Sequence, residues 1–193
     1  MVKRYFWLIM LCFLLILVIL LSDSIALNND SSLKLYLAFD EEKGKIAKDH
    51  SKSGLRGKLS GNAKFVKNGK FGGALSLEDS NSLVQLPATD ELNITKSITI
   101  AAWIFPLVNQ KDSNVIGRRT AANVGGYCMQ WSSLGAAAKI ETWIGLPVWQ
   151  GTRNLQKTEP RLEKWHHVVA MYDGNEIKQY VNGKLDASLK IPG

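Results

Sequence analysis

The stretch from Lys164 to Leu185 constrains the fold more than any other part of the sequence, because it has the pattern of short strands joined by tight turns. Residues 165–172 are rich in side chains that favour strands, and residues 176–181 alternate polar with apolar side chains. Asp173-Gly174 and Asn182-Gly183 supply the two turns, since glycine and asparagine tolerate the left-handed backbone of tight hairpins. The stretch is therefore predicted to form an antiparallel meander.

The rest of the chain continues this pattern, with strand signals and turn signals every ten residues or so and no convincing amphipathic helix. In the first predicted strand Leu33, Leu35, Leu37 and Phe39 share one face, which we expect to be buried. Residues 146–156 are predicted to be irregular. Further strands are predicted at residues 33–39, 57–59, 63–66, 82–86, 97–105, 113–119, 126–131 and 137–144. This pattern favours an all-β sandwich.

Three motifs carry a resemblance to a known family. Residues 165–185 contain Trp-His-His-Val-Val-Ala-x-Tyr-Asp-Gly followed by Tyr-Val-Asn-Gly-Lys-Leu. Earlier in the chain lie Gly-Lys-Phe-Gly-x-Ala-Leu, at residues 69–75, and Ser-Ile-Thr-Ile-Ala-Ala-Trp-Ile-Phe, at residues 97–105. In their order along the chain, these motifs resemble those of laminin G-like domains of the concanavalin A-like lectin/glucanase superfamily. The resemblance extends from about residue 35 to about residue 189. The resemblance implies two packed antiparallel sheets in a jelly roll.

Laminin G-like domains normally add two closing strands after the last hairpin, and the sequence stops at Gly193 without them. We therefore expect residues 33–193 to form a jelly-roll sandwich that lacks its last strands. An unpaired sheet edge of this kind favours self-association, and we expect such a domain to be marginally stable.

The first residues have the pattern of a targeting segment. Lys3 and Arg4 precede an apolar run from Tyr5 to Leu21, and small residues follow at Ser24 and Ala26. This predicts a secretory signal peptide over residues 1–26 and a spacer over residues 27–32. The alternative is a retained signal anchor, since a run of about 17 apolar residues is just long enough to span a bilayer. The mature protein is thus expected to be secreted or in the cell envelope, and to contact a membrane only if the segment is retained.

Charge and cysteine content exclude some classes of protein. The formal net charge is +7, but the basic residues are scattered and no nucleic-acid-reading element accompanies them, so nucleic acid is not an expected partner. Cys12 lies in the targeting segment, which leaves Cys128 without a partner for an intramolecular disulfide. Cys128 lies in an apolar strand pattern, and we expect a buried, inert thiol.

No catalytic motif is apparent. Glycosidases need two carboxyl groups about 5 Å or about 6.5–9.5 Å apart. The Glu-x-Asp-x-x-Glu strand motif of laminarinase-like relatives is absent, and the acidic clusters at residues 40–42, 78–79 and 90–91 fall at turns. His166 and His167 are adjacent on one strand, so they point to opposite faces and cannot ligate one metal. The sequence therefore predicts a protein that is not an enzyme.

Two kinds of ligand site remain as hypotheses. Trp131, Trp143 and Trp149, with Arg118, Arg119 and Arg153 near in sequence, are candidate glycan-binding residues, although large aromatics in a sandwich more often pack in the core. Trp103 and Trp165 are expected in the core. The family often carries calcium, so Asp40, Asp49, Asp79 and Asp173 are candidate calcium ligands, although aspartates in loops more often stabilise turns. No other cofactor is expected.

The function predicted from the sequence is a secreted, non-catalytic recognition module for glycans or for cell-surface adhesion. Its expected partner is a glycan or an extracellular protein. A polysaccharide-degrading glycoside hydrolase of the same fold and a purely structural surface domain are the alternatives.

Overall fold

The computed structural model describes residues 30–109, 113–118, 126–133, 138–146 and 148–191. The chain forms two compact units, residues 1–92 and residues 93–193. The single domain predicted over residues 33–193 stays a prediction, and the predicted signal peptide lies outside the described residues. Among the described residues, no helix is long and apolar enough to cross a membrane.

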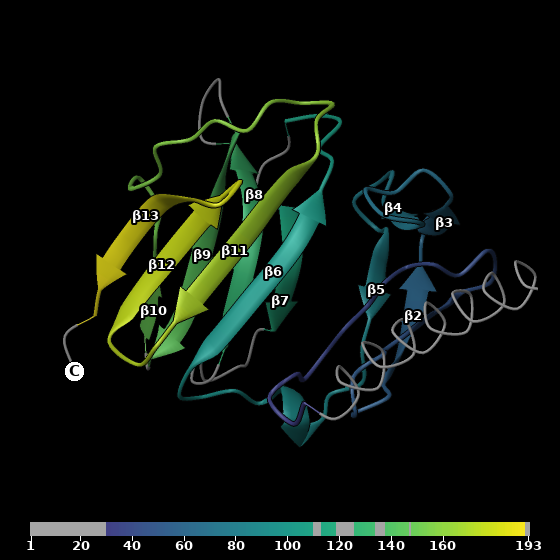
Figure 1. The fold of residues 1–193 in the computed structure, drawn as a ribbon, viewed down its shortest axis with the longest axis horizontal. Helices are drawn as coiled ribbons and strands as arrows, with labels where there is room; N and C mark the ends of the chain where they lie inside the picture. The colour runs from purple at the N-terminus through teal and green to yellow at the C-terminus, as the bar shows by residue number, and fades with distance from the viewer. Residues whose placement is uncertain (1–29, 110–112, 119–125, 134–137, 147, 192–193) are drawn as a thin grey trace, which may run out of the picture. The chain divides into compact units, whose positions relative to one another are not determined.

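The described residues of the second unit form two four-stranded antiparallel sheets (Figure 1). One has the order β13-β12-β11-β6 and the other has the order β10-β9-β8-β7. The strands of the first sheet are β6 (Ile98–Ile104), β11 (His166–Tyr172), β12 (Glu176–Val181) and β13 (Lys184–Lys190). The strands of the second sheet are β7 (Ser113–Arg118), β8 (Tyr127–Ser133), β9 (Ala138–Leu146) and β10 (Val148–Gly151). The predicted all-β, jelly-roll sandwich is confirmed in this unit.

The core of this unit lies between the two sheets. Alternate side chains of β11 and β12, including Val168, Ala170 and Ile177, meet alternate side chains of β8 and β9, including Met129 and Ile140. Because side chains alternate along a strand, every second residue of β8 and β9 points away from this core.

The Asn182-Gly183 turn has the predicted left-handed backbone, with φ of 52° and 77°. The Asn182 side chain also ties the turn to the start of β11. Its Oδ1 accepts from the backbone N–H of His167 at 3.0 Å, and its Nδ2 donates to Nδ1 of His166 at 3.1 Å. Nε2 of His166 then donates to the Arg161 carbonyl at 2.9 Å, so the His166 side chain stabilises the fold.

The described residues of the first unit, 30–92, form two small antiparallel sheets and one short helix. One sheet has the order β1-β2-β5 and the other pairs β3 with β4. The bounds are β1 (Ile46–Lys48), β2 (Arg56–Ser60), β3 (Lys64–Val66), β4 (Ala74–Ser76), β5 (Leu83–Gln85) and a 3-10 helix, η1 (Asp90–Leu92). Its core is formed by Ala47, Leu59 and Ala63, with Leu37 and Phe39 among the residues packed against them.

Two predictions about secondary structure were wrong. Residues 33–39 form only an isolated bridge between Leu37 and Asp49, because the Tyr36 N–H bonds the Asp49 side chain at 2.9 Å and Phe39 adopts φ of 59°. Residues 148–151, predicted to be irregular, form β10, which pairs with the end of β9.

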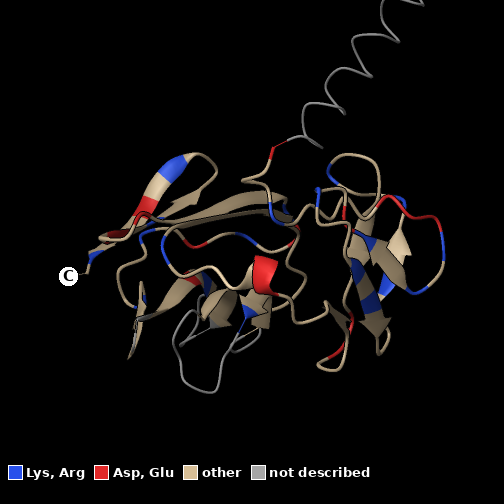
Figure 2. Cartoon of the chain, turned by 90° about the horizontal axis from the view of Figure 1, so that it is seen from below, with Lys and Arg blue, Asp and Glu red and all other residues tan. Residues whose placement is uncertain are grey.

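Charged residues are spread over many elements. In the drawing of charge, Lys and Arg are interspersed with Asp and Glu along the described chain (Figure 2). This distribution agrees with the scattered positions of the basic residues in the sequence.

Candidate functional site

The candidate site lies on the side of β8, β9 and β10 that faces away from the core. On β9, the core residues Ile140 and Ile144 leave Glu141 and Trp143 on this outer side. Gln130 of β8 is directly opposite Glu141, and cross-strand partners share a face. Trp149 of β10 and Arg153, from the turn after β10, complete the set. We call Gln130, Glu141, Trp143, Trp149 and Arg153 the outer-face cluster.

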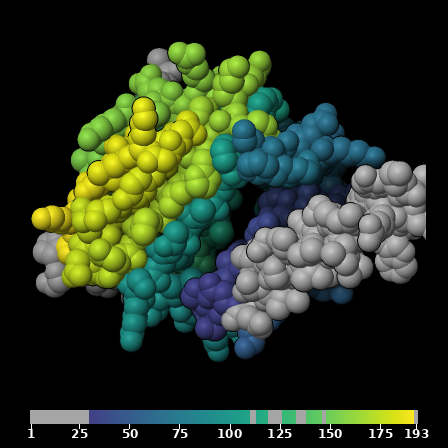
Figure 3. All heavy atoms as spheres, in the orientation of Figure 1, coloured from purple at the N-terminus to yellow at the C-terminus, as the bar shows by residue number. Residues whose placement is uncertain are grey.

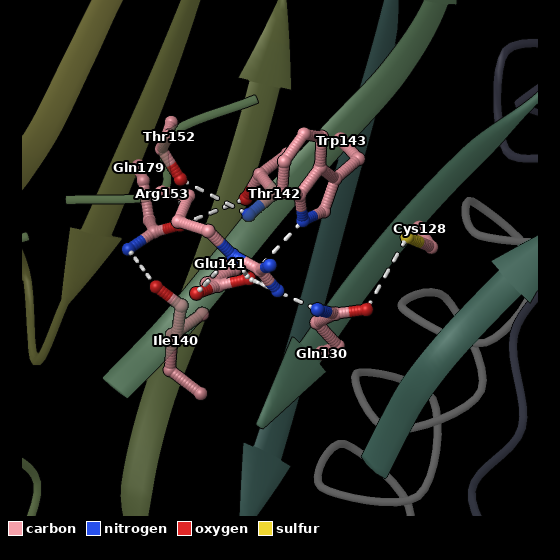
Figure 4. A network of polar contacts seen from close by, with 9 residues as sticks. All are labelled: Cys128, Gln130, Ile140, Glu141, Thr142, Trp143, Thr152, Arg153 and Gln179. Carbon is pink, nitrogen blue, oxygen red and sulfur yellow. Dashed lines mark hydrogen bonds and ion pairs between the residues drawn. The ribbon is translucent and has the colours of Figure 1, made fainter. Parts of the chain in front are cut away.

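Glu141 is the centre of this cluster, and only 2% of the residue is exposed (Figure 4). Arg153 donates from Nε to both carboxylate oxygens at 3.0 Å and from Nη2 to Oε2 at 2.8 Å. Gln130 Nε2 donates to Oε2 at 2.9 Å, and the Trp143 indole N–H donates to the same oxygen at 3.2 Å. The carboxylate is thus ion-paired and hydrogen-bonded, as a buried charge must be.

Arg153 also lies over the Trp143 ring, with its guanidinium carbon 5.1 Å from the ring centroid. This distance is within the range of a cation–π contact. The side chain of Arg153 is 33% exposed, whereas that of Glu141 is 3% exposed. A ligand on this face would therefore meet Arg153 and the indole rings first, with the carboxylate beneath them.

Glycines make room for the two tryptophans. Gly151 is the cross-strand partner of Trp143, and a Cβ at Gly151 would collide with the Trp143 ring. A Cβ at Gly126, before β8, would lie 2.8 Å from the end of the Trp149 ring. Real Cβ contacts are not this short, so both rings rest directly on backbone. The glycines thereby fix the positions of the two rings.

A second polar network, inside the sandwich, holds the turn that carries Arg153 (Figure 4). Gln179 of β12 is fully buried, and its Oε1 accepts from the hydroxyls of Thr142 at 2.9 Å and Thr152 at 3.1 Å. Its Nε2 donates to the Ile140 carbonyl and to Oδ2 of Asp186, both at 2.8 Å. All four hydrogen-bonding positions of this amide are thus used.

Asp186 extends this network to the segment after Arg153. Its Oδ1 accepts from the backbone N–H groups of Lys157 at 3.1 Å and Thr158 at 2.6 Å. Thr152 also accepts from the Thr142 N–H at 3.0 Å. The backbone on both sides of Arg153 is therefore fastened to the interior.

Comparison with known proteins places this fold in a family. The family model described as the concanavalin A-like lectin/glucanases superfamily matches residues 78–193. The chain belongs to this superfamily. The concanavalin A-like chain is also similar to domain 4 of AbnA, a GH43 extracellular arabinanase from Geobacillus stearothermophilus, solved in complex with arabinotriose.

That similarity has a TM-score of 0.61 and 18% sequence identity, and covers 83% of this chain and 77% of the arabinanase domain. At this identity it shows a shared fold. No curated protein matches the chain. The family predicted from the sequence motifs is confirmed by the family model.

The structure separates the glycan-binding candidates predicted from the sequence. Trp143 and Trp149 lie together in the outer-face cluster. Trp131 is 5% exposed in the core of the concanavalin A-like sandwich, a position that does not fit an exposed stacking ring. Arg118 is opposite Tyr127, which also belongs to that core, so it lies on the inner side of the sheet. Burial raises the pKa of the Tyr127 phenol, and the charge of Arg118 opposes the rise.

Trp103 was predicted to be a core residue, and this was wrong: it is 40% exposed. It lies on the outer side of β6 and stacks against His167 of β11, with ring centroids 5.0 Å apart. Trp165, half-buried, packs in the same way against Phe105 at 5.4 Å. Figure 3 shows β6, β11, β12 and β13, from teal to yellow, as a surface of closely packed side chains.

Each of the four candidate calcium ligands accepts hydrogen bonds from backbone N–H groups. Oδ1 of Asp40 accepts from the Gly73 N–H at 2.6 Å, and Oδ1 of Asp79 accepts from the Asn81 N–H at 2.9 Å. Oδ1 of Asp173 accepts from two N–H groups of its own turn at 2.9 Å. Within the described ranges, no three His, Cys, Asp or Glu side chains are grouped to hold a metal.

Asp49 has the most complete set of partners of these four. Its carboxylate accepts from the N–H groups of Tyr36, Ser51 and Leu55 and from the Ser51 hydroxyl. Burial alone would raise the pKa of Asp49, but these hydrogen bonds outweigh it and hold the pKa below 3.8. This arrangement joins the segment around residue 36 to the loop after β1.

Glu141 and Gln130 were not identified from the sequence. The available signal was alternation: Glu141 lies two residues before Trp143 on a predicted strand, and therefore on the same face.

Proposed function

We propose that the chain is a non-catalytic glycan-binding module that acts outside the cell, with the outer-face cluster as its binding site. The observation that carries the proposal is the placement of Trp143, Trp149 and Arg153 on one face of the sheet, where the buried Glu141 holds Trp143 and Arg153. Sugar rings have apolar C–H faces and hydroxyl edges, so they pair with indole rings beside hydrogen-bond donors.

Rigidity supports this function. Binding is weakened when side chains must be immobilised on contact with the ligand, typically by about 0.5–1.5 kcal/mol for each. Here Trp143 is held by a hydrogen bond to Glu141 and by its position on Gly151. Trp149 is held against Gly126. The indole rings are thus arranged before a ligand arrives.

The absence of a second carboxylate on the strands of this sheet supports a non-catalytic role. Among the residues of β7, β8, β9 and β10, Glu141 is the sole Asp or Glu. Glycosidase chemistry uses a pair of carboxyl groups across the scissile bond. Glu141 is also committed to Arg153, Gln130 and Trp143, so it has little capacity to act as a nucleophile or base.

The comparisons agree with an extracellular, glycan-related role. The arabinanase is described as extracellular, and its similar domain was solved with arabinotriose. The signal peptide predicted from the sequence supports the same extracellular location. Arabinotriose is therefore a reasonable first probe for this chain, together with an array of diverse glycans.

The test is binding of purified protein to a glycan array, followed by calorimetric titration of arabinotriose and of each glycan found. Replacing an aromatic ring that a bound ligand covers by alanine removes about 1.5–3 kcal/mol of apolar contact. Trp149→Ala and Trp143→Ala should therefore weaken binding by about 10-fold to 100-fold. Val148→Ala is the matched control, because Val148 is 59% exposed and alternates to the other side of β10.

The alternatives give different results. Release of reducing sugar that is abolished by Glu141→Gln would favour a hydrolase of the same fold. An array without hits, together with capture of a protein partner, would favour a structural adhesion domain. Binding that both tryptophan variants leave unchanged would show that the glycan binds elsewhere.

A further inference from the structure

We propose that the outer-face cluster selects glycans without charged groups, because Glu141 cancels the charge of Arg153. This inference deepens the glycan-binding function proposed above and rests on it. It concerns the class of glycan: neutral oligosaccharides rather than uronates or sulfated sugars.

The geometry of the ion pair carries the inference. Arginine commonly binds carboxylates and phosphates through its planar, bidentate fork. In Arg153, Nε and Nη2 already contact the Glu141 carboxylate, at 2.8 to 3.0 Å. An acidic group that approached Arg153 would also approach the Glu141 carboxylate directly beneath it. The attraction and the repulsion then nearly cancel, so nothing offsets the cost of taking the acidic group out of water, whereas a neutral sugar hydroxyl loses far less hydration.

Glu141 is not free to turn away from an acidic ligand. Gln130 and Trp143 hold Oε2 from two further directions, at 2.9 and 3.2 Å. The carboxylate is 3% exposed, so water screens its charge poorly. The negative charge is thereby fixed under the ligand-facing side of Arg153.

Lys139 is the other cation on this side of β9, and it provides a matched control. It lies two residues from Glu141, and its Nζ donates to the Gln156 carbonyl at 3.2 Å. Lys139 has no contact with the Glu141 ion pair among the hydrogen bonds and ion pairs of the described residues. If charge selection depends on the Arg153–Glu141 pair, then removing Lys139 should leave the selection unchanged.

The experiment titrates the full chain with trigalacturonate and with its methyl ester, in which methyl groups replace the carboxylate charges, and with arabinotriose as a neutral reference. Titrations are made at low ionic strength, where charge effects are strongest. The wild type should bind the ester at least tenfold more tightly than the free acid. Glu141→Gln should shift the acid-to-ester ratio toward the acid by at least tenfold, and Lys139→Gln should change it less than twofold.

Each outcome decides a different point. If the wild type binds the free acid as tightly as the ester, the inference is overturned while the glycan-binding function stands. A Lys139→Gln shift as large as that of Glu141→Gln also overturns it, because the pair then does not set the selection. If no array glycan, ester, acid or arabinotriose binds, the proposed function itself fails. Should Glu141→Gln not fold, the wild-type comparison of ester with acid still decides.

Discussion

Replacement of Gln179 by leucine is expected to destabilise the sandwich strongly. Gln179 is 0% exposed and makes four hydrogen bonds that join β12 to β9, to Thr152 and to Asp186. Leucine has a similar size but no polar atoms. The substitution would leave the Ile140 carbonyl and Oδ2 of Asp186 without this donor in the interior. Each such group costs about 1–3 kcal/mol, so for the two groups together a loss of about 2–6 kcal/mol is expected.

A loss of this size is a large fraction of the about 5–15 kcal/mol that stabilises a typical domain. The assay is urea denaturation followed by tryptophan fluorescence, which reports on the second unit because five of the six tryptophans lie after residue 93. Lys178→Ala, on the same strand but at the surface, is the control and should change stability by less than about 0.5 kcal/mol. If Gln179→Leu is as stable as the wild type, then the network does not stabilise the sandwich and the reasoning is refuted.

Three further predictions follow from local geometry. Asn182→Ala should lower the free energy of unfolding by about 1–3 kcal/mol, because alanine tolerates the left-handed backbone poorly and the hydrogen bond to His166 is lost. Asn182→Gly should lower it less in the same denaturation assay, and equal losses for the two variants would contradict this. Gly151→Ala should displace the Trp143 ring and weaken glycan binding by titration, while unaltered binding would show that the ring position is unimportant. The depressed pKa of Asp49 means that its charged form stabilises the fold above about pH 4 and that this contribution is lost as pH falls through the folded-state pKa. Asp49→Asn should therefore raise the rate of amide hydrogen exchange near residue 49 at neutral pH and make that rate depend less on acid pH. An unchanged exchange profile would contradict the role assigned to the Asp49 carboxylate.

The hairpins that join β11, β12 and β13, and the strands of the second unit other than β10, could be predicted from the sequence, because turn chemistry and alternation are local signals. Asn182-Gly183 is one case, where the turn type depends on two residues alone. The hydrogen bonds from the Asp79 and Asp173 side chains to the backbone of their turns were likewise predicted, as the alternative to calcium binding. The family could be recognised because its motifs keep their order along the chain.

The errors arose where tertiary contacts override local pattern. Residues 146–156 were predicted to be irregular, but Gly151 is a strand residue whose missing side chain makes room for Trp143. The alternating apolar residues at 33–39 suggested a strand, yet the side chain of Asp49 takes the Tyr36 N–H that a ladder would need.

The candidate site could be predicted only in part. Trp143 and Trp149 were proposed as glycan-binding residues from their residue type. Trp131 lies two residues after Met129 and so shares its face of the strand, which could have assigned Trp131 to the core. Glu141 could not be assigned a role, because its partner Arg153 is twelve residues away and meets it through the β9–β10 hairpin. Single carboxylates in strands carry no motif, so their roles depend on the fold.

The most direct test of the glycan-binding face is an NMR titration that follows the indole N–H signals while arabinotriose, or a glycan found on the array, is added to saturation. The signals of Trp143 and Trp149 should shift, and that of the core residue Trp131 should remain in place. Shifts confined to Trp103 and Trp165, on the outer side of the opposite sheet, would contradict the assignment of the outer-face cluster as the binding site.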